Sequence, residues 1–229
     1  MALYAIGDLH LSLGVDKPMD IFGGNWVNYM EKIEAGFHGI GPEDVCVLCG
    51  DISWGMQLDE CLEDFLFIKN LPGKKIILKG NHDYWWNTVT KIKAFFDANG
   101  ISNIDILHNN CYIYKETAVC GTRGWLADED LSAEQNKKIM AREVQRLRSS
   151  LDAAENVDEK ICFFHYPPRF KNISCRDIIT VMNENGVRQC YYGHLHGDGH
   201  RHAVQGEVEG IEYNMISADH IDFTPQKIR

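Results

Sequence analysis

A short apolar run followed within a few residues by Asp, Asn or His recurs five times along this chain. Such runs have the length and composition of buried β-strands. In an open α/β sheet, ligands bind at the carboxyl ends of the strands, so polar residues that follow different strands can meet in one cleft. The pattern therefore predicts one polar site built from most of the sequence. Its members are Asp8, His10, Asp51, Asn81, His82, His165, His194 and His196.

In the first half of the chain, the apolar runs alternate with helical patterns, which favours a layered α/β sheet over a separate β domain. We expect strands at residues 3–6, 45–49, 75–78, 161–164, 187–192 and 211–216, and a hairpin-like group at 104–107, 111–114 and 118–120. The expected helices are 26–34, 58–70, 88–98, 133–154 and 176–184. A chain of 229 residues can bury an adequate core without disulfides, so residues 1–229 are expected to form one domain.

The cysteines indicate a reduced core. Cys46 and Cys49 form a CxxC by spelling, but residues three apart in a strand face opposite sides and are poorly placed to chelate an ion or form a bridge. With no recognisable secretory signal at the start of the chain, reduced cysteines favour a cytoplasmic location. Six of the eight cysteines lie in the apolar runs: Cys46, Cys49, Cys111, Cys120, Cys162 and Cys190.

The charge balance limits the kinds of partner. A formal net charge of −10 disfavours a protein that tracks long nucleic acids, because phosphate backbones are bound by clustered Lys and Arg. No apolar run approaches the roughly 18 residues that a membrane span needs. No obligate protein partner is indicated, and a small anionic substrate drawn by local charge is the expected ligand.

The recurring polar residues form a mixed nitrogen and oxygen donor set. Imidazoles, carboxylates and an amide suit Mn, Fe, Zn, Co or Ni, whereas Ca prefers oxygen donors alone. A lone Asp-x-His or His-x-His is a weak signal, since a single histidine at a strand end is more often a hydrogen-bonded structural residue. Five such fragments in order, each after an apolar run, favour a metal site.

These five fragments resemble the ordered motifs of the calcineurin-like metallophosphoesterases, in the manner of their bacterial-type phosphohydrolases. The fragments are Gly7-Asp8-Leu9-His10, Gly50-Asp51, Gly80-Asn81-His82-Asp83, His165 and Gly193-His194-Leu195-His196. The resemblance spans residues 7–196 and implies a four-layer α/β/β/α sandwich of two mixed sheets with a binuclear metal centre at its edge. It also implies metal-dependent hydrolysis of a phosphomonoester or phosphodiester by a metal-bound hydroxide, with Mn as the first choice of metal.

By the same resemblance, one ion takes Asp8, His10 and His196. The other takes Asn81, His165 and His194. Asp51 bridges the two. A carboxylate is suited to that position because two adjacent divalent ions repel each other.

The resemblance gives His82 a role in catalysis, either stabilising the phosphoryl oxygen or protonating the leaving group. The alternative is a residue that only orients Asn81 or water. Protein serine/threonine phosphatases of this superfamily carry an Asp and an Arg after the second motif, which the run from Gly50 to Met56 lacks, and this disfavours a protein phosphatase. Asp83 stands where those enzymes have Glu. Arg123, in a loop after a strand, is a candidate substitute phosphate ligand, with a plain surface role as the alternative.

Other residues near the motifs have open roles. His200 and His202 either line the rim of the site or bind an adventitious ion, but solvated loop positions are the favoured interpretation. A nuclease of the same superfamily and a non-catalytic scaffold are the competing functions. Aromatic residues near the motif loops either line the cleft or pack against helices: Trp54, Tyr84, Trp85, Trp86 and Trp125.

Overall fold

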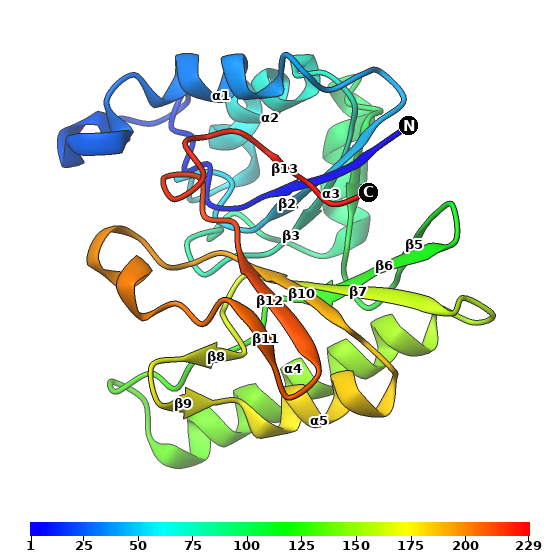
Figure 1. Cartoon of the computed structure of the whole chain (residues 1–229). Helices are drawn as coiled ribbons and strands as arrows, with labels where there is room; N and C mark the ends of the chain where they lie inside the picture. The colour runs from blue at the N-terminus through cyan, green and yellow to red at the C-terminus, as the bar shows by residue number, and fades with distance from the viewer.

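The computed structural model describes residues 1–229 as two facing β-sheets with helices on their outer sides (Figure 1). The first sheet has the order β13-β1-β2-β3-β4, and its strands are parallel except for β13. Its strands are β1 (Leu3–Ile6), β2 (Val45–Cys49), β3 (Lys74–Leu78), β4 (Ile104–Ile106) and β13 (Gln226–Lys227).

The second sheet has the order β11-β12-β10-β7-β6-β5, with antiparallel β5 and β11 at its edges. The two sheets are therefore both mixed, as predicted. A separate pair, β8 (Arg169–Phe170) and β9 (Ile173–Ser174), lies outside them. The strands of the second sheet are β5 (Tyr112–Tyr114), β6 (Thr117–Thr122), β7 (Glu159–Phe164), β10 (Gln189–Tyr192), β11 (Gly206–Val208) and β12 (Ile211–Met215).

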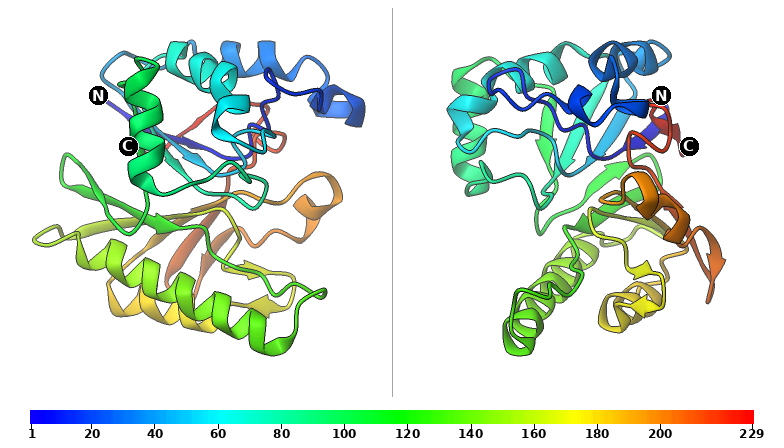
Figure 2. Two further views of the ribbon diagram at one scale, coloured as in Figure 1. Left: turned by 180° about the vertical axis from the view of Figure 1, so that it is seen from behind. Right: turned by 90° about the vertical axis from the view of Figure 1, so that its left-hand side faces the viewer.

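Five α-helices form the two outer layers and complete the predicted four-layer α/β/β/α sandwich (Figure 2). The first sheet is covered by α1 (Tyr29–Phe37), α2 (Leu62–Asn70) and α3 (Val89–Ala98). The second is covered by α4 (Ala133–Asp152) and α5 (Arg176–Glu184). The long helix α4 begins at a capping box, in which Ser132 and Gln135 each accept the other's backbone N–H.

Three apolar clusters fill the spaces between the four layers. The middle cluster joins the inner faces of the two sheets through side chains such as Val47, Cys49 and Phe163. Cys46 belongs instead to the cluster under α1–α3. The pair thus faces opposite sides of β2, and all eight cysteines are free thiols.

Two predicted elements were wrong in detail. Residues 104–106 do not join a hairpin group with 112–122; β4 pairs with β3 in the first sheet, and only β5 and β6 form the hairpin. The helix predicted from residue 26 begins at Tyr29, because Asn28 has a left-handed φ of 55° that separates α1 from a 3₁₀ turn at Gly24–Trp26.

The carboxyl ends of strands from both sheets meet where β1 and β12 end. The Gly7 N–H donates to the Ile216 carbonyl (2.7 Å), and the Ala218 N–H donates to the Gly7 carbonyl (3.0 Å). This junction brings the loops after β1, β2 and β3 beside those after β7 and β10. None of the helices combines the length and apolar character required to cross a bilayer.

Candidate metal centre

The predicted site residues lie on loops that directly follow strands of both sheets. Four of them adopt positive φ angles: Asp8 (60°), His10 (48°), Asp51 (49°) and His194 (72°). Such conformations cost about 1–3 kcal/mol each in a non-glycine residue and cluster at functional sites. The strained loops turn these four side chains into the space between the sheet ends.

Asp8, His10 and His196 form the first group of candidate ligands. The Nε2 atoms of His10 and His196 lie 3.3 Å apart, and His196 Nε2 is 3.6 Å from Asp8 Oδ1. The Asp8 carboxylate is completely buried and is held by the backbone N–H of His194, at 3.0 and 2.9 Å from its two oxygens.

Asn81, His165 and His194 form the second group. Asn81 Oδ1 lies 2.5 Å from His165 Nε2 and 3.0 Å from His194 Nδ1. The other ring nitrogen of His165, Nδ1, lies 3.1 Å from the Cys49 carbonyl. A proton on Nδ1 donated to that carbonyl leaves the Nε2 lone pair free to bind a metal.

Asp51 joins the two groups. Its Oδ2 atom lies 3.6 Å from His10 Nε2 in the first group and 3.5 Å from His165 Nε2 in the second. Its Oδ1 accepts the backbone N–H of His82 at 2.8 Å, which fixes the orientation of the carboxylate. One buried oxygen therefore faces both sets of donors, as a bridging ligand requires.

The positions of these donor atoms suit binding to metal ions better than hydrogen bonding to one another. Ligand atoms about 2.0–2.2 Å from one ion lie roughly 3–3.5 Å from one another. The spacings of 3.3 Å between His10 and His196 and 3.0 Å between Asn81 and His194 fall in this range, whereas Asn81 Oδ1 and His165 Nε2 are closer, at 2.5 Å. His10 Nε2 and His196 Nε2 face each other, and His10 Nδ1 is buried without a hydrogen-bond partner. Converging lone pairs of this kind call for cations between them.

A family model described as calcineurin-like phosphoesterase matches residues 1–198. The chain belongs to this family. The known members of such a family hydrolyse phosphoesters with metal ions, and the Asp and His clusters here are groups that could hold those ions. A comparison with curated proteins finds no significant match.

Solved structures share the fold at low sequence identity. A phosphopantetheinyl hydrolase from Mycobacterium tuberculosis is 12% identical with a TM-score of 0.60, and the match covers 99% of this chain and 95% of that one. A protein of unknown function from Aquifex aeolicus is 17% identical with a TM-score of 0.51 over the same shares of the two chains. A protein from Thermus thermophilus is 12% identical with a TM-score of 0.52, covering 85% of this chain and 81% of that one.

Burial and charge set the protonation of the histidines in this phosphoesterase. Burial lowers the pKa of both His165 and His194 to about 3, so both rings are neutral near pH 7, as metal ligands must be. His196 differs. Burial opposes its charged form, but hydrogen bonds with Asp219 and Asp8 outweigh burial and raise its pKa to about 10, so a metal that binds His196 must displace a proton.

Asp219 is a site residue that the sequence interpretation missed. Its Oδ1 lies 2.8 Å from His196 Nδ1, so it selects the tautomer that turns Nε2 toward Asp8 and His10. Its Oδ2 lies 3.2 Å from His200 Nε2. The available signal was weak, an isolated Asp after the strand at 211–215.

Asp83 forms hydrogen bonds to both the loop after β2 and the loop after β3. Its Oδ2 accepts the backbone N–H groups of Asp51 (3.0 Å) and Gly80 (2.6 Å). Its Oδ1 accepts the N–H of Ile52 (2.8 Å) and the indole N–H of Trp85 (3.0 Å). Asp83 therefore positions the bridging Asp51 from behind.

His82 lies beside the metal cluster, with its ring centroid 4.5 Å from that of Trp54 and 5.8 Å from that of His10. Its Nδ1 is buried without a hydrogen-bond partner. Burial lowers the pKa of His82, partly offset by the negative charge of Asp8. Its predicted catalytic role remains a prediction.

Arg123 is near the site through its backbone, while its side chain turns elsewhere. Its carbonyl accepts the N–H groups of His165 (3.2 Å) and Tyr166 (2.8 Å). Its guanidinium lies over the Trp125 ring, 5.1 Å from the centroid, and 3.6 Å from Glu143. The role of Arg123 as a phosphate ligand at the cluster is thus neither supported nor contradicted by its contacts.

The aromatic residues divide between the two predicted roles. Trp85 is buried against Phe65 beneath the helices, whereas Trp54 stacks on His10 at a centroid distance of 4.9 Å. Trp26, which had no predicted role, lies 5.6 Å from His196 by the same measure. Tyr84 is exposed.

The two loop histidines differ from each other. His200 is not a freely solvated residue, because it pairs with Asp219 and packs on His220. The favoured solvated interpretation was wrong for it. His202 is exposed, which agrees with that interpretation.

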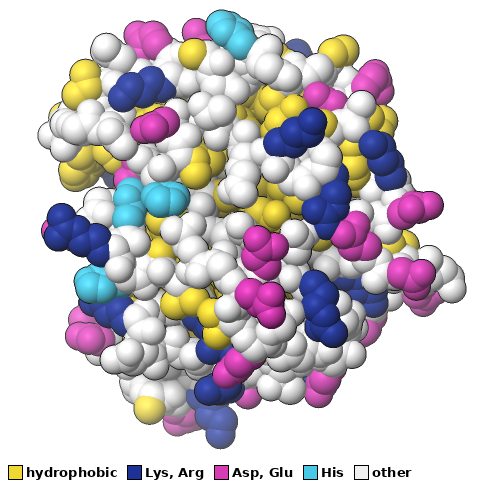
Figure 3. Space-filling view, viewed as in Figure 1, with side chains coloured by type: hydrophobic (Ala, Val, Ile, Leu, Met, Phe, Trp, Pro, Cys, Tyr) yellow, Lys and Arg dark blue, Asp and Glu magenta, His cyan; other side chains and the backbone are white.

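Beside the first group of candidate ligands lies a cavity of about 530 Å³. Histidine side chains gather on the face shown in Figure 3, at the level where the two halves of the molecule meet. His10 and His196 line the cavity together with four apolar or aromatic residues: Met19, Phe22, Trp26 and Trp54.

Proposed function

We propose that this chain hydrolyses a small phosphomonoester or phosphodiester at a centre of two divalent metal ions. Asp8, His10 and His196 hold one ion, and the bridging carboxylate is Asp51. Asn81, His165 and His194 hold the other. The observation that carries the proposal is the position of Asp51 Oδ2, 3.6 and 3.5 Å from one imidazole of each group.

The bound metals supply Lewis acidity and an activated water for attack on phosphorus. The centre would keep a net positive charge, because the Asp8 and Asp51 carboxylates only partly neutralise two divalent ions and the imidazoles add no negative charge. This excess attracts a phosphate into an otherwise acidic protein. Mn²⁺ is the proposed metal, with Fe, Zn, Co and Ni as alternatives that the same donors accept.

His82 is proposed to donate a proton to the leaving oxygen or a hydrogen bond to the phosphoryl oxygen. Its ring lies beside those of His10 and Trp54, next to the cluster. Because burial lowers the pKa of His82, its ring is mainly neutral near pH 7, and its N–H is better suited to the hydrogen bond than to proton donation.

An apolar or aryl part of the substrate is proposed to occupy the cavity lined by Met19, Trp26 and Trp54. Aromatic rings and a thioether suit an apolar or aryl group rather than a second polar chain. The similarity to a phosphopantetheinyl hydrolase, at 12% identity, shows a shared fold and does not identify the substrate. The proposed substrate preference therefore depends on the residues that line this cavity. A small substrate also fits better than a long nucleic acid, given the formal net charge of −10.

The test is hydrolysis of p-nitrophenyl phosphate and bis-p-nitrophenyl phosphate by metal-stripped protein refilled with Mn²⁺. An Asp51→Asn variant is the control, because it keeps the side-chain size and removes the bridging charge. Activity restored by metal in wild type and absent in the variant supports the proposal, and the preferred reporter separates monoester from diester chemistry. If each of the five metals leaves wild type as inert as the variant, a non-catalytic scaffold replaces this function.

A further inference from the structure

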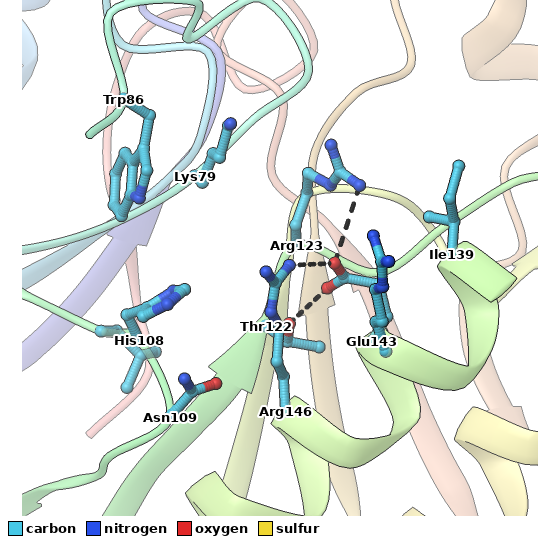
Figure 4. A pocket seen from close by; sticks show the side chains of 11 residues that line it. Lys79, Trp86, His108, Asn109, Thr122, Arg123, Ile139, Glu143 and Arg146 are labelled. Carbon is cyan, nitrogen blue, oxygen red and sulfur yellow. Dashed lines mark hydrogen bonds and ion pairs between the residues drawn. The ribbon is translucent and has the colours of Figure 1, made fainter. Parts of the chain in front are cut away.

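A second cavity, of about 250 Å³, opens between the ends of β3, β4 and β6 and one side of α4 (Figure 4). Lys79, Trp86 and His108 line one side of it, and Arg123 and the α4 residues line the other. It shares no lining residue with the cavity beside His10 and His196.

Positive charge is concentrated in this second cavity. Four cationic side chains, Lys79, Arg123, Arg142 and Arg146, line it together with a single carboxylate, that of Glu143. Such an excess is unusual in a chain whose formal net charge is −10. We refer to these four cationic residues as the basic pocket.

Glu143 organises the basic pocket without neutralising it. Its side chain is completely buried and accepts hydrogen bonds from Thr122 Oγ1 (2.5 Å) and Arg146 (2.5 Å), with Arg123 3.6 Å away. A buried carboxylate with these partners holds two guanidinium groups in fixed positions. One acceptor cannot serve all the donors of two guanidiniums.

Several donors in the basic pocket remain without a protein partner. Arg123 Nε is buried and has no acceptor. Neither Lys79 nor Arg142 has an ion pair or a side-chain hydrogen bond. An anion in the cavity would accept hydrogen bonds from these free donors.

The basic pocket adjoins the second group of candidate metal ligands. Lys79 stands two residues before Asn81 in the loop after β3. Arg123 accepts the backbone N–H of His165 with its carbonyl. An anion in the pocket therefore lies next to the loops that carry two of the three ligands of that group.

We propose that the basic pocket binds a second phosphate group of the substrate while the first reacts at the metal cluster. Guanidinium groups match phosphate oxygens in bidentate geometry, and Lys79 adds a point charge. The catalytic part of this inference rests on the proposed function, whereas anion binding by the pocket does not. The substrate class is thus a compound that carries two phosphates.

The binding test uses inorganic pyrophosphate, titrated calorimetrically in metal-free buffer into the full chain carrying Asp51→Asn. A matched pair of further variants is then compared. Lys79→Gln with Arg142→Gln removes two pocket cations that have no structural partner. Arg148→Gln removes a cation of the same helix that pairs with Glu184 outside the pocket. We expect the first to weaken pyrophosphate binding by about tenfold or more and the second to leave it within about twofold.

Two results of the binding test would overturn the proposal. One is the absence of pyrophosphate binding in the Asp51→Asn chain, which would assign all anion binding to the metal cluster. The other is an equal loss in Arg148→Gln, which would indicate general surface charge. Circular dichroism of each variant checks that the fold is retained.

The substrate test uses Mn²⁺-loaded wild type with alkanediol bisphosphates of increasing chain length and the matching alkyl monophosphates. We expect one length of bisphosphate to have a kcat/KM at least about tenfold above its monophosphate, and that ratio to fall toward one in the Lys79→Gln, Arg142→Gln variant. Ratios near one at every length in wild type would overturn the substrate class. Hydrolysis of neither series, with pyrophosphate binding intact, would count against the proposed function and leave the anion site standing.

Discussion

Replacing Asp83 by Asn should weaken the hydrogen bonds that hold the loop of the bridging residue, Asp51, in position. The two side chains have nearly the same size, so the change tests hydrogen bonding rather than packing. In the wild type Oδ2 of Asp83 accepts two N–H donors and Oδ1 accepts three. An amide offers one oxygen and one NH₂ group, so one orientation leaves two buried donors facing a donor and the other leaves three.

The expected cost follows from that count. A buried donor left without its acceptor costs about 1–3 kcal/mol. With Oδ2 replaced, the unpaired groups are the N–H of Asp51 and the N–H of Gly80. With Oδ1 replaced, they are the N–H groups of Ile52, Ser53 and the Trp85 indole. The orientation that leaves only two donors unpaired costs less, and it predicts a fall in unfolding free energy of about 2–6 kcal/mol for Asp83→Asn.

Urea unfolding at pH 7.5 and the Mn²⁺ content after dialysis measure the two consequences. Asp97→Asn is the control, because Asp97 lies on the exposed face of α3 and makes no side-chain hydrogen bond. We expect Asp83→Asn to lose stability and to retain less metal than the control. Equal unfolding midpoints and equal metal content in the two variants would refute the reasoning about Asp83.

Three further outcomes are expected. Asp219→Ala frees His196 to change tautomer, so Mn²⁺ affinity measured by calorimetry should fall about 10–100-fold; unchanged affinity would contradict the assigned role. Gly193→Ala places a methyl group against the Asp8 carboxylate, so elemental analysis should find less bound metal than in wild type. Burial lowers the pKa of Lys75 from 10.5 in the unfolded chain to about 8, so the unfolded state binds more protons between these values. The unfolding free energy of wild type relative to Lys75→Met should therefore rise by roughly 3 kcal/mol from pH 8 to pH 10.5 in urea titrations.

The candidate ligands were predictable from sequence because each follows a strand at a short, local distance. Asp8, Asp51 and Asn81 come within three residues of a strand end, so an apolar run and its polar successor could be recognised without knowing the fold. The parallel packing of the strands then brings them together.

Residues that reach the site through distant packing could not be found in this way. Asp219 lies beside His196 only because β12 ends against Gly7 of the other sheet. Trp26 lies at the cluster because a 3₁₀ turn before α1 carries it there. Sheet membership has the same origin, since nothing local in residues 104–106 distinguishes pairing with β3 from pairing with β5.

The number of metal ions bound per chain tests the central claim most directly. Metal-stripped wild type and Asp51→Asn are titrated with Mn²⁺, and bound metal is measured after removal of the free ion. The structure predicts two ions per wild-type chain, because Asp51 faces two separate groups of donors, and a marked loss in the variant. Binding of fewer than two ions by wild type, or identical binding by both proteins, would contradict a binuclear centre bridged by Asp51.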